Sequence, residues 1–214
     1  RTDTGVHATG QVVSVDMPTH WDGPKLRKAL NATLPRDIWV ESAEVVPGDF
    51  HPRFDAVARS YRYEVGTHSM AASPFHRRWC WALTEPLDIE VLQALATRLP
   101  GTRPFRSFSK SGQPERGYVC SVERAGWSTW ELGVRFEITA NRYLHHMVRY
   151  LVGTMVDIGR GRRPPDVFEA LLEGDPETLT SPPAPPEGLF LTLVEYPSGS
   201  STPVKTTTGS DIQA

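Results

Sequence analysis

The chain has 214 residues, 39% of them hydrophobic and 22% charged, which is the composition of a globular protein long enough to bury a core. Its formal net charge of −2 excludes a protein that is basic throughout, so a polyanion would have to bind basic residues gathered on one face. The two cysteines, Cys80 and Cys120, lack metal-ligand spacing and predict free thiols in a reducing compartment such as the cytoplasm. Because apolar runs stay well short of a membrane span, no membrane partner is expected.

The N-terminal part predicts a turn, two strands and one helix. Gly5 favours a tight turn because glycine adopts positive φ without steric cost. Apolar and polar residues alternate over 13–17, as in a half-buried strand. Asp22 predicts a helix N-cap with Pro24 in the first turn, and residues 38–45 predict a second strand.

The rest of the chain alternates between strands and single helices. A strand over 57–65 places Arg59 and Tyr61 on one face, and Asp88 predicts the N-cap of an amphipathic helix. The further predicted elements are a hairpin of 118–125 with 131–139 across a turn at 126–130, a long helix over 141–158, a short helix from 166 and a strand over 188–196. This order, with hairpins between helices, indicates an α+β fold rather than a doubly wound parallel sheet.

Composition also predicts where the chain divides. Pro, Gly and Asp at positions 47–49 interrupt the second predicted strand, so we place a boundary between subdomains of residues 1–50 and 51–197. Ser, Thr and Gly dominate residues 198–214, which predicts a disordered tail.

Asp3 is the first candidate for catalysis. It lies between Thr2 and Thr4, with Arg1 two positions before it and Gly5 two positions after it. A guanidinium group near a carboxylate favours its ionised form, as a nucleophile requires. From spacing alone, however, an ordinary solvated turn is the favoured interpretation, since Asp and Gly are common turn residues.

Two other patterns allow both structural and functional interpretations. A Tyr-x-Tyr strand at Tyr61 is more often core than a platform for a base, and Arg149 is as readily a surface charge as a catalytic one. His145 and His146 resemble metal ligands, but adjacent helical residues point about 100° apart, so a metal site is not expected.

Basic residues are concentrated in loops. Each of them is by itself a solvated charge, but together they predict contacts with an RNA backbone that would position the RNA rather than specify its sequence. They are Arg77, Arg78, Arg103, Arg106, Lys110, Arg160, Arg162 and Arg163.

Three segments in this order resemble the tRNA pseudouridine synthase A family: RTDTGVHATGQVV from Arg1, YRY from Tyr61 and NRYLHHMVR from residue 141. Shorter segments at 31–35, 49–54 and 187–189 add to the resemblance, which extends to about residue 196.

The resemblance implies the α+β pseudouridine synthase fold, with two related subdomains of mainly antiparallel sheet and flanking helices around a central cleft. It implies isomerisation of uridine to pseudouridine on the 3′ side of the tRNA anticodon stem-loop, by a homodimer that uses no cofactor and no metal.

The family's site residues carry over position by position. Asp3 matches the catalytic nucleophile, Arg149 matches the arginine that holds the carboxylate ionised, and Tyr61 matches the tyrosine that packs against the target uridine. Arg1, Arg59 and His145 are the further residues that we expect to contact the substrate.

The family has a strand and a helix upstream of the RTD motif, so we expect the N-terminal subdomain to lack them here. Two alternatives stay open. One is a catalytically inactive RNA-binding fragment of the same fold, and the other is a metal-dependent hydrolase using His7, His145 and His146.

Overall fold

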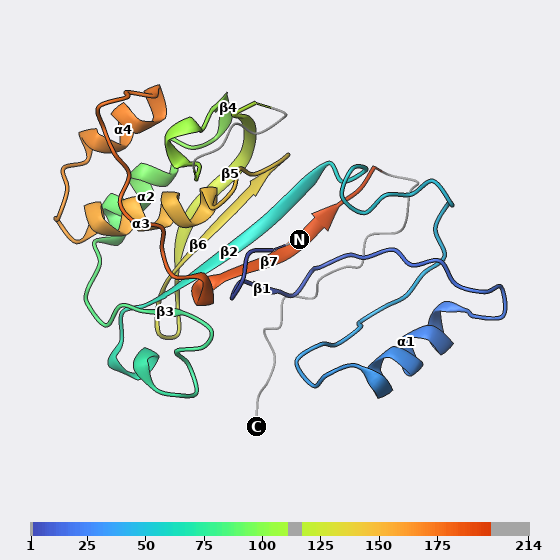
Figure 1. Cartoon of the computed structure of the whole chain (residues 1–214). Helices are drawn as coiled ribbons and strands as arrows, with labels where there is room; N and C mark the ends of the chain where they lie inside the picture. Colours follow the sequence, from blue (N-terminus) through green and yellow to red (C-terminus); the bar gives the residue numbers. More distant parts are fainter. Residues whose placement is uncertain (1, 111–116, 198–214) are drawn as a thin grey trace. The chain divides into compact units, whose positions relative to one another are not determined.

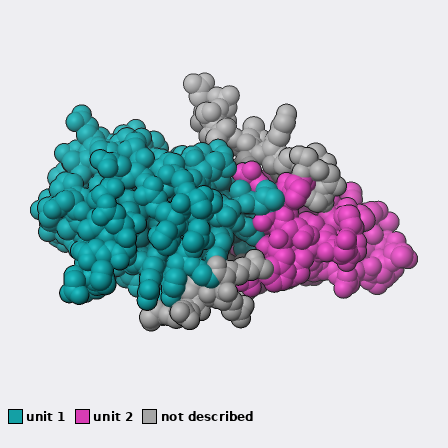
Figure 2. Space-filling view, turned by 90° about the horizontal axis from the view of Figure 1, so that it is seen from above, with its two compact units in different colours: residues 1–11, 57–194 teal, residues 12–56, 195–214 magenta. Residues whose placement is uncertain are grey.

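The computed structural model describes residues 2–110 and 117–197 (Figure 1). Arg1 and the predicted tail at 198–214 lie outside the described residues. The chain forms two compact units (Figure 2). Of the described residues, one unit comprises 2–11 and 57–194 without the gap at 111–116, and the other comprises 12–56 and 195–197. The predicted subdomain boundary at residue 50 stays a prediction. Within the described part of the chain, every helix is too short or too polar to cross a bilayer.

The larger unit is built on one mixed sheet. Its strands follow the order β1-β7-β2-β6-β5-β4, and β3, which lies off this path, pairs with the end of β2 at Val65 and Gly66. The strands are β1 (His7–Ala8), β2 (Ala58–Gly66), β3 (Trp81–Ala82), β4 (Gly101–Pro104), β5 (Val119–Trp130), β6 (Gly133–Ala140) and β7 (Leu189–Glu195). The pairs β2–β6, β5–β6 and β4–β5 are antiparallel, whereas β1 on β7 and β3 on β2 are parallel. The α+β class predicted from the sequence is therefore confirmed.

The turn of the β5–β6 hairpin lies further along the chain than the predicted turn at 126–130, which begins at Gly126. The structure continues β5 through Gly126 to Trp130 and places the turn at 131–132. Trp127 explains the difference, because it is buried opposite Phe136, with the two rings 5.1 Å apart, and its backbone N–H donates to Oε1 of Gln93 at 2.7 Å. Burial of this aromatic pair outweighs the local turn preference of Gly126.

Helices cover one face of this sheet and enclose the core. They are α2 (Ile89–Ala96), α3 (Met147–Gly159) and α4 (Asp166–Glu173), with the short 3-10 turns η1 (Ser69–Ala72), η2 (Arg106–Phe108) and η3 (Pro186–Gly188) between elements (Figure 1). Asp88 caps α2 by accepting from the N–H groups of Glu90 and Val91, as its sequence position predicted. Leu151, Val152 and Met155 of α3 are fully buried against Tyr63 and Phe136 of the sheet.

The smaller unit contains α1 (Gly23–Thr33), whose N-cap at Asp22 is as predicted. The side chain of Asn31 bonds to both the carbonyl oxygen and the N–H of Val40, at 2.9 and 2.7 Å. The strands predicted over 13–17 and 38–45 are wrong, because the structure leaves both segments without strand pairing. Their apolar side chains are exposed, and an amide side chain supplies the partners that a neighbouring strand would supply.

We predict that Phe136→Ala lowers the free energy of unfolding by about 3–5 kcal/mol, because a fully buried ring is removed and leaves a cavity. Urea unfolding followed by tryptophan fluorescence measures this loss. Val119→Ala, at a half-exposed position of the same sheet, is the control and should change stability by less than about 0.5 kcal/mol. Equal effects of the two substitutions would contradict this description of the core.

Candidate active site

Asp3 lies in a tight turn anchored to the edge of the sheet. The N–H of Val6 donates to the carbonyl oxygen of Asp3 at 3.1 Å, and Gly5 has φ +81°. A Cβ on Gly5 would lie 3.0 Å from Cγ of Pro186, so this position requires glycine for both its backbone angle and its space. The following strand β1 pairs with β7 and fixes the turn at one end of the sheet.

Two histidines approach the Asp3 carboxylate. Nε2 of His145 lies 3.5 Å from Oδ1, and Nε2 of His146 lies 3.4 Å from Oδ2. The two imidazole rings are 4.2 Å apart. These three side chains form one cluster, in which His146 is the member that was not expected from the sequence.

The expectation that the two histidines diverge on a helix is wrong, because α3 begins only at Met147. His146 precedes the helix with φ +63°, in the left-handed region that residues with a side chain seldom adopt. The segment between β6 and α3 is therefore a loop, and its left-handed residue allows both rings to approach Asp3. Such strained positions are concentrated at functional sites.

The charge state of His146 depends on its surroundings. Burial lowers the pKa of its imidazole, and the positive charges of Arg149 and Lys110 lower it further, while the Asp3 carboxylate raises it. The net shift is downward, so His146 is neutral at a lower pH than an exposed histidine would be.

Tyr61 joins the site from β2. Its ring packs edge-on against Tyr143, with the centroids 4.9 Å apart. Burial raises the pKa of the Tyr61 phenol, and the negative charge of Asp3 raises it further. Tyr143, for which no role was expected from the sequence, donates its hydroxyl to the carbonyl oxygens of Arg59 and Ile138, at 3.0 Å each.

Two of the three arginines predicted for the site contact backbone carbonyls, and the third, Arg1, lies outside the described residues. Arg149 donates through Nε to the carbonyl oxygen of Ala184 at 2.6 Å, and Arg59 donates through Nη1 to that of Asn141 at 2.8 Å. Among residues 2–110 and 117–197, the nitrogen-bearing side chains within 4.0 Å of the Asp3 carboxylate are the two histidines rather than Arg149. The positive charge of Arg149 nevertheless lowers the pKa of the His146 imidazole.

Part of the predicted basic set has structural partners. Arg160 donates to Glu85 through Nε at 2.9 Å, and Arg162 lies 3.8 Å from the same carboxylate. Arg163 donates to Ser181 and to the carbonyl oxygen of Leu179. These contacts tie the segment after α3 to neighbouring loops. His7, which one alternative placed in a metal site, instead bonds to the carbonyl oxygen of Arg78 at 2.8 Å.

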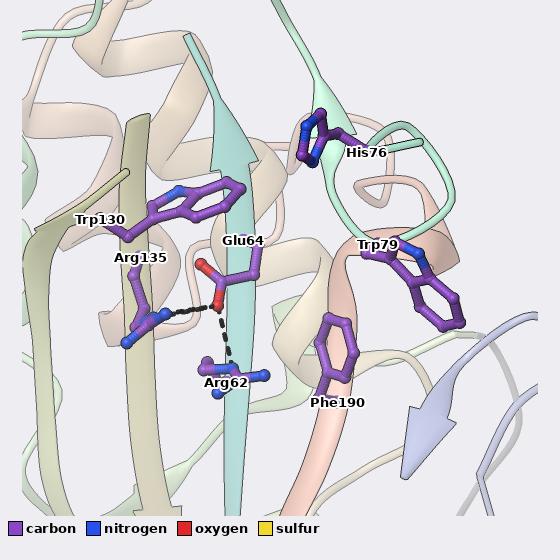
Figure 3. A pocket seen from close by; sticks show the side chains of 7 residues that line it. All are labelled: Arg62, Glu64, His76, Trp79, Trp130, Arg135 and Phe190. Carbon is purple, nitrogen blue, oxygen red and sulfur yellow. Dashed lines mark hydrogen bonds and ion pairs between the residues drawn. The ribbon is translucent and has the colours of Figure 1, made fainter. Parts of the chain in front are cut away.

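A separate pocket of about 230 Å³ lies on the opposite face of the sheet (Figure 3). Arg62 and Glu64 alternate along β2 with Tyr61 and therefore point to the other side. Glu64 accepts a hydrogen bond from Nε of Arg135 at 3.0 Å, and Nε of Arg62 lies 3.0 Å from the same oxygen in a geometry that makes no hydrogen bond. Burial raises the pKa of the Glu64 carboxyl, and the two guanidinium groups partly counter this shift. The remaining lining residues are His76, Trp79, Trp130 and Phe190.

Comparison with known proteins defines the class to which this fold and site belong. A family model described as tRNA pseudouridine synthase matches residues 95–197, which contain β4 to β7 and both site histidines. The fold predicted for that class, with a mainly antiparallel sheet and flanking helices, is the one observed.

Relatives from several bacteria narrow the class. A tRNA pseudouridine synthase A of Chlorobium luteolum is 40% identical over 197 residues, covering 92% of this chain and 77% of that protein. Those of Moorella thermoacetica and Syntrophomonas wolfei are 40% and 36% identical, over 92% and 94% of this chain and 79% and 80% of their own lengths. The chain belongs to the tRNA pseudouridine synthase A family, which is a family of isomerases.

Gly5→Ala is predicted to destabilise the larger unit by about 1–2 kcal/mol, the cost of a left-handed backbone for a residue with Cβ, in addition to the contact with Pro186. Urea unfolding measures the change. Gly48→Ala is the matched control, because a Cβ there meets nothing within 4 Å. An unchanged stability of Gly5→Ala would show that the turn does not depend on this backbone angle.

Proposed function

We propose that this protein isomerises uridine to pseudouridine on the 3′ side of the tRNA anticodon stem-loop, with Asp3 as the catalytic nucleophile. The observation that carries the proposal is the Asp3 carboxylate, presented by a glycine-dependent turn within electrostatic reach of Tyr61. Family membership supports the reaction class, and the names of the relatives support tRNA as the substrate.

The reaction breaks the bond between N1 of uracil and the sugar, turns the base and forms a bond from the sugar to C5. The hydrogen on C5 leaves as a proton and N1 gains one, so the product is an isomer of the substrate. No electrons are exchanged with a cofactor. In this scheme the Asp3 carboxylate acts on the nucleotide while its glycosidic bond is broken.

Tyr61 would hold the target base. An enzyme that modifies a base in structured RNA removes it from its stack and replaces the lost stacking with an aromatic face. Tyr61 is half-buried and supported edge-on by Tyr143, which fixes the orientation of its ring. Its position near Asp3 would present the stacked nucleotide to the carboxylate.

Charged neighbours would complete the site. We propose that Arg149 favours the ionised form of Asp3 through its charge, which reaches His146 beside that carboxylate, and that His145 and Arg59 contact the substrate. We propose that Arg1 also contacts the substrate, although it lies outside the described residues. The loop residues Arg77, Arg78, Arg103, Arg106 and Lys110 would bind RNA phosphates.

We further propose a cytoplasmic homodimer. The loop around η1 exposes the apolar side chains of Met70, Phe75 and Trp79, as expected of a surface that contacts another protein. Both cysteines are free and buried, which suits a reducing compartment. Analytical ultracentrifugation would test the dimer.

Asp3→Asn should lower the rate of tritium release from tRNA labelled at uridine C5 by about 10⁴-fold or more, the scale on which loss of a nucleophile acts. The substitution removes the nucleophilic oxygen and the charge while keeping the shape of the side chain. Asp16→Asn, at an exposed position of the smaller unit, is the matched control and should release tritium at the parent rate.

Equal release by the parent and Asp3→Asn would exclude Asp3 as the nucleophile. A folded parent that binds tRNA with a steep salt dependence but releases no tritium would instead be the inactive RNA-binding fragment. Circular dichroism of each variant establishes that it is folded.

Tyr61→Leu is expected to weaken tRNA binding by about 1–3 kcal/mol, the contribution of one base stacked on an aromatic ring. Tyr61→Phe keeps the ring and should bind tRNA nearly as the parent does. Filter binding at fixed salt measures both. Equally weak binding by the two variants would assign the role of Tyr61 to its hydroxyl and contradict stacking.

A further inference from the structure

We propose that Asp3, His145 and His146 form a binding site for a divalent transition-metal ion of the zinc class. The site goes beyond the proposed function. Only one of its consequences, inhibition of the isomerase by the bound ion, rests on the role of Asp3 proposed above.

The donor atoms have the spacing that such an ion requires. One ligand atom from each of the three residues lies within 4.8 Å of the other two. The two N···O separations, 3.4 and 3.5 Å, are longer than a hydrogen bond. Each separation is close to the edge of a zinc coordination tetrahedron, which is about 3.3 Å for bonds of about 2.0–2.1 Å. The two separations end on different oxygens of Asp3, so the carboxylate must turn one oxygen toward both nitrogens when an ion binds.

The backbone also holds the donors in place before an ion binds. The left-handed conformation of His146 brings two consecutive imidazoles to one carboxylate, and both rings present Nε2 to it. The preceding loop is fixed by the carbonyl oxygen of His145, which accepts from the N–H of Lys110 at 3.1 Å. Closing the three donors around an ion then requires the Asp3 carboxylate to turn one oxygen toward both imidazoles.

The chemistry of the donors selects the class of ion. Two imidazoles and one carboxylate suit Zn²⁺, Co²⁺ or Ni²⁺, whereas Mg²⁺ and Ca²⁺ prefer oxygen ligands alone. Three protein ligands leave a fourth position open, and the His145 side chain is 56% exposed, so an ion can enter from solvent. Arg149 and Lys110 oppose a cation near His146, so we expect weaker binding than in a closed structural zinc site.

Occupation of the site would remove Asp3 from catalysis. A carboxylate oxygen bound to a metal ion is no longer free to attack a nucleotide. A bound zinc-class ion would therefore inhibit the isomerase reversibly, and removal of the ion by a chelator would restore activity.

The test is a titration of untagged, EDTA-treated protein with Co²⁺ in the absence of RNA, followed by visible absorption and calorimetry. We expect stoichiometric binding with the intense d–d bands of a four-coordinate ion, unaffected by excess Mg²⁺. His145→Ala and Asp3→Asn should each weaken Co²⁺ binding by about 100-fold. Loss of a residue that only hydrogen-bonds to a metal ligand already costs up to about 100-fold in affinity, and these two residues are themselves ligands. His20→Ala, at an exposed position in the other unit, should bind as the parent does.

Weak octahedral absorption, or binding that His145→Ala leaves unchanged, would overturn the proposal. Charge-transfer bands from thiolate to cobalt would also overturn it, because they would assign the ion to Cys80 or Cys120. Tritium release measured in parallel separates the two proposals. Cobalt that stays bound in the presence of tRNA but leaves the isomerase active would contradict the role of Asp3 and not the metal site. Absence of binding, with activity still dependent on Asp3, would contradict the metal site alone.

Discussion

The site depends on one short parallel pairing, that of β1 with β7. His7 and Ala8 align with Phe190 and Leu191, and the carbonyl oxygen of Leu191 accepts from two further N–H groups, at 2.9 and 3.1 Å. These few bonds join segments that lie at nearly opposite ends of the described chain, and the entropy of closing so long a loop must be offset by the core around them. The Asp3 turn is held only because the sheet to which β1 pairs is already rigid.

Successive side chains of β2 point to opposite faces of the sheet, so the aromatic and the charged residues of this strand lie on different faces. Tyr61 and Tyr63 point to the face covered by α2 and α3, and the Tyr63 hydroxyl donates to the carbonyl oxygen of Pro185 just before β7. Arg62 and Glu64 point to the opposite face and form a charged pocket with Arg135. A slip of one residue in the register of β2 would exchange the two faces, so the antiparallel pairing with β6 fixes the site as firmly as the core.

The smaller unit is held differently. α1 fully buries none of its residues, and side chains bond it to the backbone of the segment that follows, as Asn31 does with Val40. Each such bond contributes about 1 kcal/mol, far less than burial of an aromatic core. This explains why the strands predicted there did not form: alternating apolar residues make a strand only where another strand accepts their backbone groups and another layer covers their side chains.

The sequence by itself determined the α+β class, the caps at Asp22 and Asp88, the turn at Gly5 and the strands β2 and β7, because each depends on local propensity or on a period that neighbouring residues set. Family resemblance supplied Asp3, Tyr61 and Arg149 as candidates. Only the tertiary structure decided that His146 lies beside Asp3, that Arg149 bonds to Ala184 and that the hairpin turn falls at 131–132. These features depend on a left-handed residue before α3 and on aromatic packing across strands. The bonds of Arg149 to Ala184 and of Trp127 to Gln93 join residues 35 and 34 positions apart in the chain, and no local pattern contains such contacts.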